Sequence, residues 1–151
     1  MFRKKILKGN NTLKKNFIKK YLYPIPCMIG SKLRLLANSA IDISDGFYGD
    51  LEKLLHFKDL GASIDMESMP ILPKLKKFIR LHRINVNKLL SAGDDYEILF
   101  TSNPKKRNLI NALSEKNKIK ITKIGTVINK KGIYIDGEIL NLKKKSFQYR
   151  F

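Results

Sequence analysis

The chain has 151 residues, 43% of them hydrophobic, so it is long enough to bury the core of one globular domain and too apolar for a disordered segment. Its single cysteine, Cys27, excludes an internal disulfide and agrees with a reducing compartment. No apolar run approaches the roughly 18 residues of a membrane-spanning helix, and no secretory signal core follows the basic N-terminus. We therefore expect a cytoplasmic protein without a membrane partner.

The chain is strongly basic, with 31 lysine and arginine residues against 13 acidic residues and a formal net charge of +18. Such a charge indicates a polyanionic ligand, which can be nucleic acid, anionic lipid or a phosphorylated small molecule. The basic residues are mostly lysines, however, and they are spread along a chain that is also rich in asparagine and isoleucine. A nucleic-acid surface usually clusters arginine with aromatic residues, so a nucleic-acid-binding protein remains an alternative but is disfavoured.

The first 30 residues differ in pattern from the rest of the chain. Residues 1–20 alternate lysine with apolar side chains and predict a basic helix. Residues 21–26, Tyr-Leu-Tyr-Pro-Ile-Pro, predict an extended linker, because a residue before proline is pushed out of the helical region. We therefore divide the chain into a basic helix with a linker, 1–30, and a main domain, 31–151, which opens with a short helix over 31–38.

Residues 41–46, Ile-Asp-Ile-Ser-Asp-Gly, place two carboxylates and a hydroxyl between a strand and an amphipathic helix over 47–55. Either Ser44 or Asp45 is a suitable cap for that helix. Carboxylates such as those of Asp42 and Asp45 are ligands that Mg²⁺ prefers, and backbone N–H groups at a helix start suit phosphate oxygens. The motif alone is more typical of an ordinary capped turn, with a site for Mg²⁺ and phosphate as the functional alternative.

Residues 93–97, Gly-Asp-Asp-Tyr-Glu, form a second acidic motif just before the apolar stretch 98–100. Two such clusters near strand ends, in a chain with only 13 acidic residues, indicate that some of them bind cations. The two histidines, His56 and His82, are distant from each other and from the cysteine, so no zinc site or nucleophilic arrangement is predicted.

The middle of the chain predicts further helices and strands. Asp59-Leu60-Gly61 predicts the end of the first helix, with Gly61 as its glycine cap. Residues 62–66 alternate in polarity as a strand does, and 74–90 predict a helix in two pieces. An extended loop over 69–73 separates them.

The last third of the chain predicts a helix followed by strands. Asn103 before Pro104 predicts a capped helix start, and the helix runs to about residue 116. Residues 118–128 are strand-like, and 133–140 predict a tight hairpin around an Asp-Gly turn. The whole pattern predicts an α+β fold, with a mixed sheet flanked by helices.

The order of these motifs resembles the C-terminal half of the thiamine-monophosphate kinase family, which belongs to the aminoimidazole ribonucleotide synthetase superfamily. The resemblance extends from about residue 13 to the tail and implies the C-terminal domain fold of that superfamily. Five segments carry it: 21–26, 42–46 (Asp-Ile-Ser-Asp-Gly), 61–65 (Gly-Ala-Ser-Ile-Asp), 93–101 (Gly-Asp-Asp-Tyr-Glu-Ile-Leu-Phe-Thr) and 121–125.

The resemblance implies transfer of the γ-phosphoryl group of ATP to thiamine monophosphate, which gives thiamine diphosphate, with Mg²⁺ as the cofactor. It implies Asp42 and Asp45 as Mg²⁺ ligands, Ser44 as a nucleotide-binding residue, and Asp94 and Phe147 as substrate-binding residues. The acceptor is a phosphate oxygen that is already anionic at neutral pH, so no general base is needed and no catalytic residue is assigned.

The chain also departs from the family. The family's N-terminal domain, which carries most of its Mg²⁺-binding aspartates and its dimer core, is expected to be absent. Residues 92–93 are Ala-Gly where the family usually has Gly-Gly, and 146–151 differ from its usual Gly-aromatic-x-His-Phe ending. We therefore expect a chain that is nearly inactive alone and that forms a homodimer or joins a separate N-terminal half. A non-catalytic remnant or binding module is the alternative.

Overall fold

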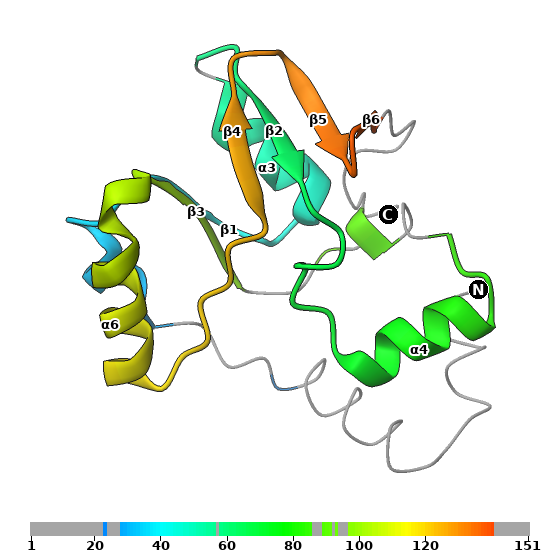
Figure 1. Cartoon of the computed structure of the whole chain (residues 1–151), viewed down its shortest axis with the longest axis horizontal. Helices are drawn as coiled ribbons and strands as arrows, with labels where there is room; N and C mark the ends of the chain where they lie inside the picture. Colours follow the sequence, from blue (N-terminus) through cyan, green and yellow to red (C-terminus); the bar gives the residue numbers. More distant parts are fainter. Residues whose placement is uncertain are drawn as a thin grey trace.

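The computed structural model describes residues 23, 28–56, 58–85, 89–91, 93 and 97–140. Most of the predicted basic helix and linker, the C-terminal tail with Phe147, and Asp94 lie outside these residues. Figure 1 shows the described part as two β-sheets with helices around them. The predicted α+β class, with a mixed sheet flanked by helices, is confirmed.

The first sheet has two antiparallel strands, β1 (Ala37–Asp42) and β3 (Ile98–Ser102). Both strands are predicted from their apolar residues, and each adjoins one of the two acidic motifs. The register places Asp42, the last residue of β1, opposite Ile98, the first residue of β3. The two acidic motifs therefore adjoin the same end of this sheet.

A 3₁₀ helix, η1 (Gly30–Leu33), precedes β1 and is shorter than the helix predicted over 31–38. The backbone after η1 already finds partners on β3. The hydroxyl of Ser102 donates to the carbonyl of Leu36 at 2.6 Å, and pairing between the two strands begins at the next residue. Since strand pairing satisfies these backbone groups, the helix does not continue.

The second sheet has four strands in the order β4 (Gly125–Ile128), β2 (Gly61–Ile64), β5 (Gly132–Ile135) and β6 (Glu138–Ile139). Strand β2 is antiparallel to β4 and parallel to β5, while β5 and β6 are antiparallel. The sheet is therefore mixed, with β2 at its centre.

The predicted hairpin is confirmed as β5 and β6. Its turn residues, Asp136 and Gly137, have φ values of 50° and 89°, the left-handed conformations that an Asp-Gly turn between antiparallel strands requires. The strand predicted over 118–128 is confined to its last four residues, which form β4.

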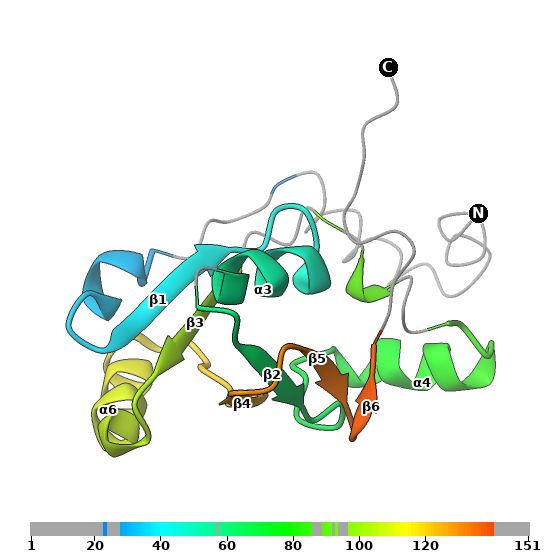
Figure 2. The ribbon, with the colours of Figure 1, turned by 90° about the horizontal axis from the view of Figure 1, so that it is seen from above.

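Helix α3 (Phe47–His56) packs on the second sheet, and it confirms the predicted amphipathic helix (Figure 2). The hydroxyl of Tyr48 donates to the carbonyl of Leu140 at 3.0 Å, which ties the helix to the chain after β6. Apolar side chains of the helix and the sheet form one buried core cluster, which includes Phe47, Tyr48, Leu51, Leu55, Ala62, Ile64 and Ile133.

The prediction that Gly61 caps this helix is wrong. Helix α3 ends at His56, and the residue with left-handed backbone after it is Asp59, with a φ of 50°. Gly61 instead begins β2 and is buried. A Cβ atom on it would lie 2.0 Å from the carbonyl oxygen of Lys130, so the glycine is required by the close approach of the neighbouring backbone.

Helix α4 (Pro73–Leu81) is the first of the two helical pieces predicted over 74–90. Part of the second piece, 86–88, lies outside the described residues. The loop before α4 is joined to it by Glu67, whose carboxylate lies 3.1 Å from the guanidinium of Arg80.

Helix α6 (Arg107–Asn117) confirms the helix predicted after residue 103, and it lies beside the first sheet in Figures 1 and 2. It is preceded by η2 (Pro104–Lys106), and the side-chain oxygen of Asn103 accepts a hydrogen bond from the N–H of Lys105 at 2.9 Å. The predicted cap is therefore present. Among the helices that the structure describes, none is long and apolar enough to cross a membrane.

Candidate functional site

The candidate site is built on residues 42–46, which we call the acidic turn. It joins the end of β1 to the start of α3. Asp42 is exposed, Ser44 is half-buried, and the side chain of Asp45 is 48% exposed. Gly46 is buried with a φ of 118°, a conformation that favours glycine. The turn thus presents carboxylate oxygens at the surface between a strand and a helix.

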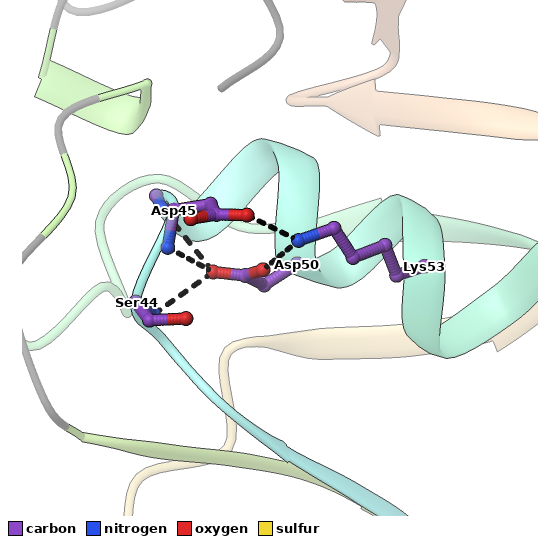
Figure 3. Close-up of polar contacts among 5 residues, drawn as sticks. Ser44, Asp45, Asp50 and Lys53 are labelled. Atoms are coloured by element: carbon purple, nitrogen blue, oxygen red, sulfur yellow. Dashed lines mark hydrogen bonds and ion pairs between the residues drawn. The ribbon is translucent and has the colours of Figure 1, made fainter. Parts of the chain in front are cut away.

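The backbone of the acidic turn is held by a carboxylate from inside α3. Oδ2 of Asp50 accepts hydrogen bonds from the N–H groups of Ser44 at 3.0 Å, Asp45 at 2.9 Å and Gly46 at 3.2 Å (Figure 3). Asp50 is only 1% exposed. The prediction that the backbone N–H groups of this motif face a phosphate is therefore wrong for these three residues. Asp50 also fills the stabilising role that the sequence assigned to a cap by Ser44 or Asp45.

Lys53 joins Asp50 to Asp45. Its Nζ lies 2.8 Å from Oδ1 of Asp50 and 2.6 Å from Oδ2 of Asp45 (Figure 3). The hydrogen bond to Asp45, followed by that to Asp50, raises the pKa of Lys53 to about 12. The ammonium group therefore stays charged at neutral pH and offsets one of the two carboxylates. If Asp45 binds a cation through Oδ2, it must exchange this contact with Lys53.

The sequence pattern indicates no positioning role for Asp50 or Lys53. Their spacing of three residues on a helix is typical of an exposed ion pair, which contributes little. Burial distinguishes Asp50 from such a pair, and burial of one polar residue in an amphipathic helix leaves no signal in the polarity pattern.

The second acidic motif meets the acidic turn. The N–H of Ile43 donates to the carbonyl of Glu97 at 2.8 Å. The backbone of Gly93 lies so close to the turn that a Cβ on it would be 2.3 Å from the carbonyl oxygen of Ser44. Asp94, the predicted substrate-binding residue, lies outside the described residues, but the flanking Gly93 and Glu97 both contact the turn. The structure thus brings both described ends of the second motif, Gly93 and Glu97, against the acidic turn.

The donor set of the turn suits Mg²⁺ in part. Asp42, Ser44 and Asp45 offer the oxygen ligands that Mg²⁺ takes, and Mg²⁺ usually keeps several waters beside one or two carboxylates and a substrate phosphate. Within the described ranges, no group of three or more His, Cys, Asp or Glu side chains is arranged to enclose a metal ion. The residues therefore fit a Mg²⁺ ion that shares its shell with water and phosphate rather than one enclosed by protein.

Two pockets of the described part lie away from the acidic turn. One of about 370 Å³ is at the second sheet and includes Asp65 and Asp136 in its lining. The other, of about 430 Å³, is lined by residues of α3 and β5, among them Lys53, which also contacts Asp45. Neither includes Asp42, Ser44 or Asp45, so the turn is not part of either hollow.

The chain is similar to known proteins along most of its length. Thiamine-monophosphate kinase of Buchnera aphidicola subsp. Schizaphis graminum is 36% identical over 150 residues, which cover 98% of this chain and 45% of that protein. The crystal structure of thiamine-monophosphate kinase from Stenotrophomonas maltophilia matches with a TM-score of 0.75 at 30% identity, over 83% of this chain and 40% of that chain.

A structure of AaThiL complexed with AMPPCP and TMP matches with a TM-score of 0.73, over 92% of this chain and 43% of that one, and at 24% identity it supports the fold alone. The chain spans less than half the length of each of these three proteins. The family model described as AIR synthase related protein, C-terminal domain, matches residues 8–138. The chain therefore belongs to the AIR synthase related protein family and carries its C-terminal domain.

Proposed function

We propose that this chain is the C-terminal part of an ATP-dependent thiamine-phosphate kinase, which transfers the γ-phosphoryl group of ATP to thiamine monophosphate and yields thiamine diphosphate. The observation that carries the proposal is the meeting of the two acidic motifs, through Gly93 against Ser44 and Glu97 bonded to Ile43. The similarity to a thiamine-monophosphate kinase over 98% of the chain supports this reaction rather than another phosphoryl transfer.

The proposed roles are those that the family resemblance implies. Asp42 and Asp45 hold Mg²⁺, Ser44 contacts the nucleotide, and Asp94 and Phe147 contact the thiamine substrate. When bound, Mg²⁺ neutralises the charge on the phosphates of the two substrates. The anionic acceptor oxygen needs no base, which agrees with a turn that offers carboxylates and a hydroxyl but no histidine.

Electrostatics supports a cation at this turn. ATP and thiamine monophosphate are anionic, so the exposed carboxylates of Asp42 and Asp45 repel them unless a cation lies between. Away from the turn, a net charge of +18 favours the approach of polyanionic ligands. AaThiL, which has the same fold, has been solved with AMPPCP and TMP, so a nucleotide analogue is the first ligand to test with this chain.

We further propose that catalysis requires either a homodimer or a separate N-terminal half, in the cytoplasm. The chain spans 45% of the length of the Buchnera kinase, so more than half of that kinase lies outside the matched region. The chain alone is therefore expected to have little activity.

The test is Mg²⁺- and ATP-dependent formation of thiamine diphosphate from thiamine monophosphate. It compares the chain alone with a mixture of the chain and the N-terminal half of the Buchnera kinase. We expect activity in the mixture only. Asp42→Asn should abolish it, while Asp59→Asn, which changes an exposed carboxylate at the other end of α3, should leave it intact. An inactive mixture, with the fold intact by circular dichroism, would refute the kinase and favour a non-catalytic binding module.

A further inference from the structure

The acidic turn directs its backbone donors inward. Three successive N–H groups, those of Ser44, Asp45 and Gly46, converge on one oxygen of Asp50. Successive N–H groups of this kind form a concavity that binds anions, and at a helix start they commonly hold a phosphate. In this chain the concavity is filled by a carboxylate of the chain itself.

We propose that Asp50 is the positioning residue of the acidic turn. By taking the backbone N–H groups inward, it leaves the side chains of Asp42, Ser44 and Asp45 as the ligand groups of the turn. The carboxylates then bind a cation, and a phosphate binds through that cation and the Ser44 hydroxyl rather than through the backbone N–H groups of the turn. The identity of cation and phosphate, Mg²⁺ and the ATP phosphates, rests on the proposed function.

Burial and charge support this role for Asp50. With 1% exposure, its carboxylate has almost no contact with water that could replace the three N–H donors. Hydrogen bonds to an ionised acceptor are roughly twice as strong as neutral ones. The carboxylate also lies in the first turn of α3, where the helix dipole favours negative charge. A phosphate would have to displace this anion from three donors at once.

Lys53 completes the arrangement on the other oxygen of Asp50. Its ammonium lies 2.8 Å from Oδ1 of Asp50 and 2.6 Å from Oδ2 of Asp45, so these two carboxylates share one positive charge within the fold. The full negative charge that the turn presents to solvent is then that of the exposed Asp42, and the half-exposed Asp45 adds the part that Lys53 does not offset. Asp50 therefore holds the conformation of the turn, while Asp42 and Asp45 are the carboxylates that bind the cation.

The test is an NMR titration of the ¹⁵N-labelled full chain with Mg²⁺ alone and, separately, with inorganic phosphate in the absence of divalent cations. In the wild-type chain we expect Mg²⁺ to shift the amide signals of the acidic turn and phosphate to leave those of Ser44, Asp45 and Gly46 unchanged. Asp50→Asn keeps the shape and an acceptor oxygen but removes the charge. It should weaken Mg²⁺ binding about tenfold or more, as loss of a group that orients metal ligands does.

A matched control separates positioning from general stability. Leu55→Ala truncates another buried residue of α3 whose side chain belongs to the apolar core. It should lower the midpoint of urea unfolding and keep the Mg²⁺ affinity within about twofold of wild type. If Asp50→Asn does not fold, the phosphate titration of the wild-type chain remains decisive, because the inference forbids a shift of the three amides.

Four results would overturn the inference: phosphate alone shifts those amides, the wild-type chain binds no Mg²⁺, Asp50→Asn keeps its Mg²⁺ affinity, or Leu55→Ala loses it equally. The kinase proposal fails separately. An inactive mixture of the two halves, with Mg²⁺ binding still dependent on Asp50, would refute the kinase and leave the role of Asp50 standing.

Discussion

Gly93→Ala tests whether the contact between the two acidic motifs is as close as the structure has it. The new Cβ would lie 2.3 Å from the carbonyl oxygen of Ser44 and 3.3 Å from the carbonyl carbon of Asp45. A carbon and an oxygen normally approach to about 3.3 Å, so the two segments must separate by roughly 1 Å. The acidic turn is fixed by its bonds to Asp50, so we expect the segment around Gly93 to move.

The size of the effect follows from this displacement. Forcing an extra carbon into a packed contact typically costs about 1–3 kcal/mol of unfolding free energy. With a urea dependence of about 2 kcal/mol per molar, a typical value for a small domain, the unfolding midpoint should fall by about 1 M. In the mixture of the two halves, a shift of about 1 Å in a positioning segment should reduce turnover by about 100-fold.

The assay is urea unfolding followed by far-ultraviolet circular dichroism, together with the Mg²⁺ titration of the chain. Gly30→Ala is the matched control, since its Cβ would meet only Cδ1 of Ile98 at 3.5 Å, an ordinary van der Waals contact. We expect the control to stay within about 0.5 kcal/mol of wild type. If Gly93→Ala unfolds at the same urea concentration as the control and binds Mg²⁺ as well as wild type, the two motifs are not in this close contact.

Two further predictions concern the fold around the site. Asn103→Ala removes the hydrogen bond from the N–H of Lys105 and should lower the free energy of unfolding in urea by about 1 kcal/mol. Asn108→Ala, a change within α6, should not, and equal effects would contradict the cap. Lys131 lowers the pKa of Asp59 through a hydrogen bond at 2.6 Å, so Lys131→Gln should raise that pKa toward 3.8 in a carboxyl NMR titration, while Lys120→Gln should not. Because the pKa of Asp59 is lower in the folded chain, this pair stabilises the fold above pH 3.8 and loses its effect as the pH falls through the folded pKa. An unchanged pKa of Asp59 in Lys131→Gln would show that the pair does not form in solution.

Much of the fold could be predicted because its signals are local. The capped start at Asn103, the Asp-Gly hairpin turn at residues 136–137 and the amphipathic spacing of α3 each depend on a few neighbouring residues. The pairing of β2 with β5 depends on residues far apart in the chain, so no local pattern encodes it. The wrong prediction for Gly61 has the same cause. In the sequence, a glycine required by the close approach of a neighbouring strand cannot be distinguished from a glycine that caps a helix.

The candidate site was only partly predictable. The sequence identifies two acidic motifs, and the family resemblance, rather than any spacing, indicates that they serve one site. The sequence also favours a helix start whose N–H groups face a phosphate, because helix starts commonly bind phosphate in this way. In the structure the N–H groups face Asp50 instead, and this depends on Asp50 being buried. A carboxylate three residues before a lysine indicates a surface ion pair unless its exposure is known.

The central position of β2 has a consequence for how the chain is made. Its partners β4 and β5 follow it by about 60 and 70 residues, and at the usual 5–20 residues per second of protein synthesis β5 emerges roughly 4–14 s after β2. Until then the apolar residues Ala62 and Ile64 and the core face of α3 have no sheet to bury them. The nascent chain therefore exposes apolar surface on the ribosome for seconds. We expect chaperones that bind unfolded chains to bind this surface before the domain has folded.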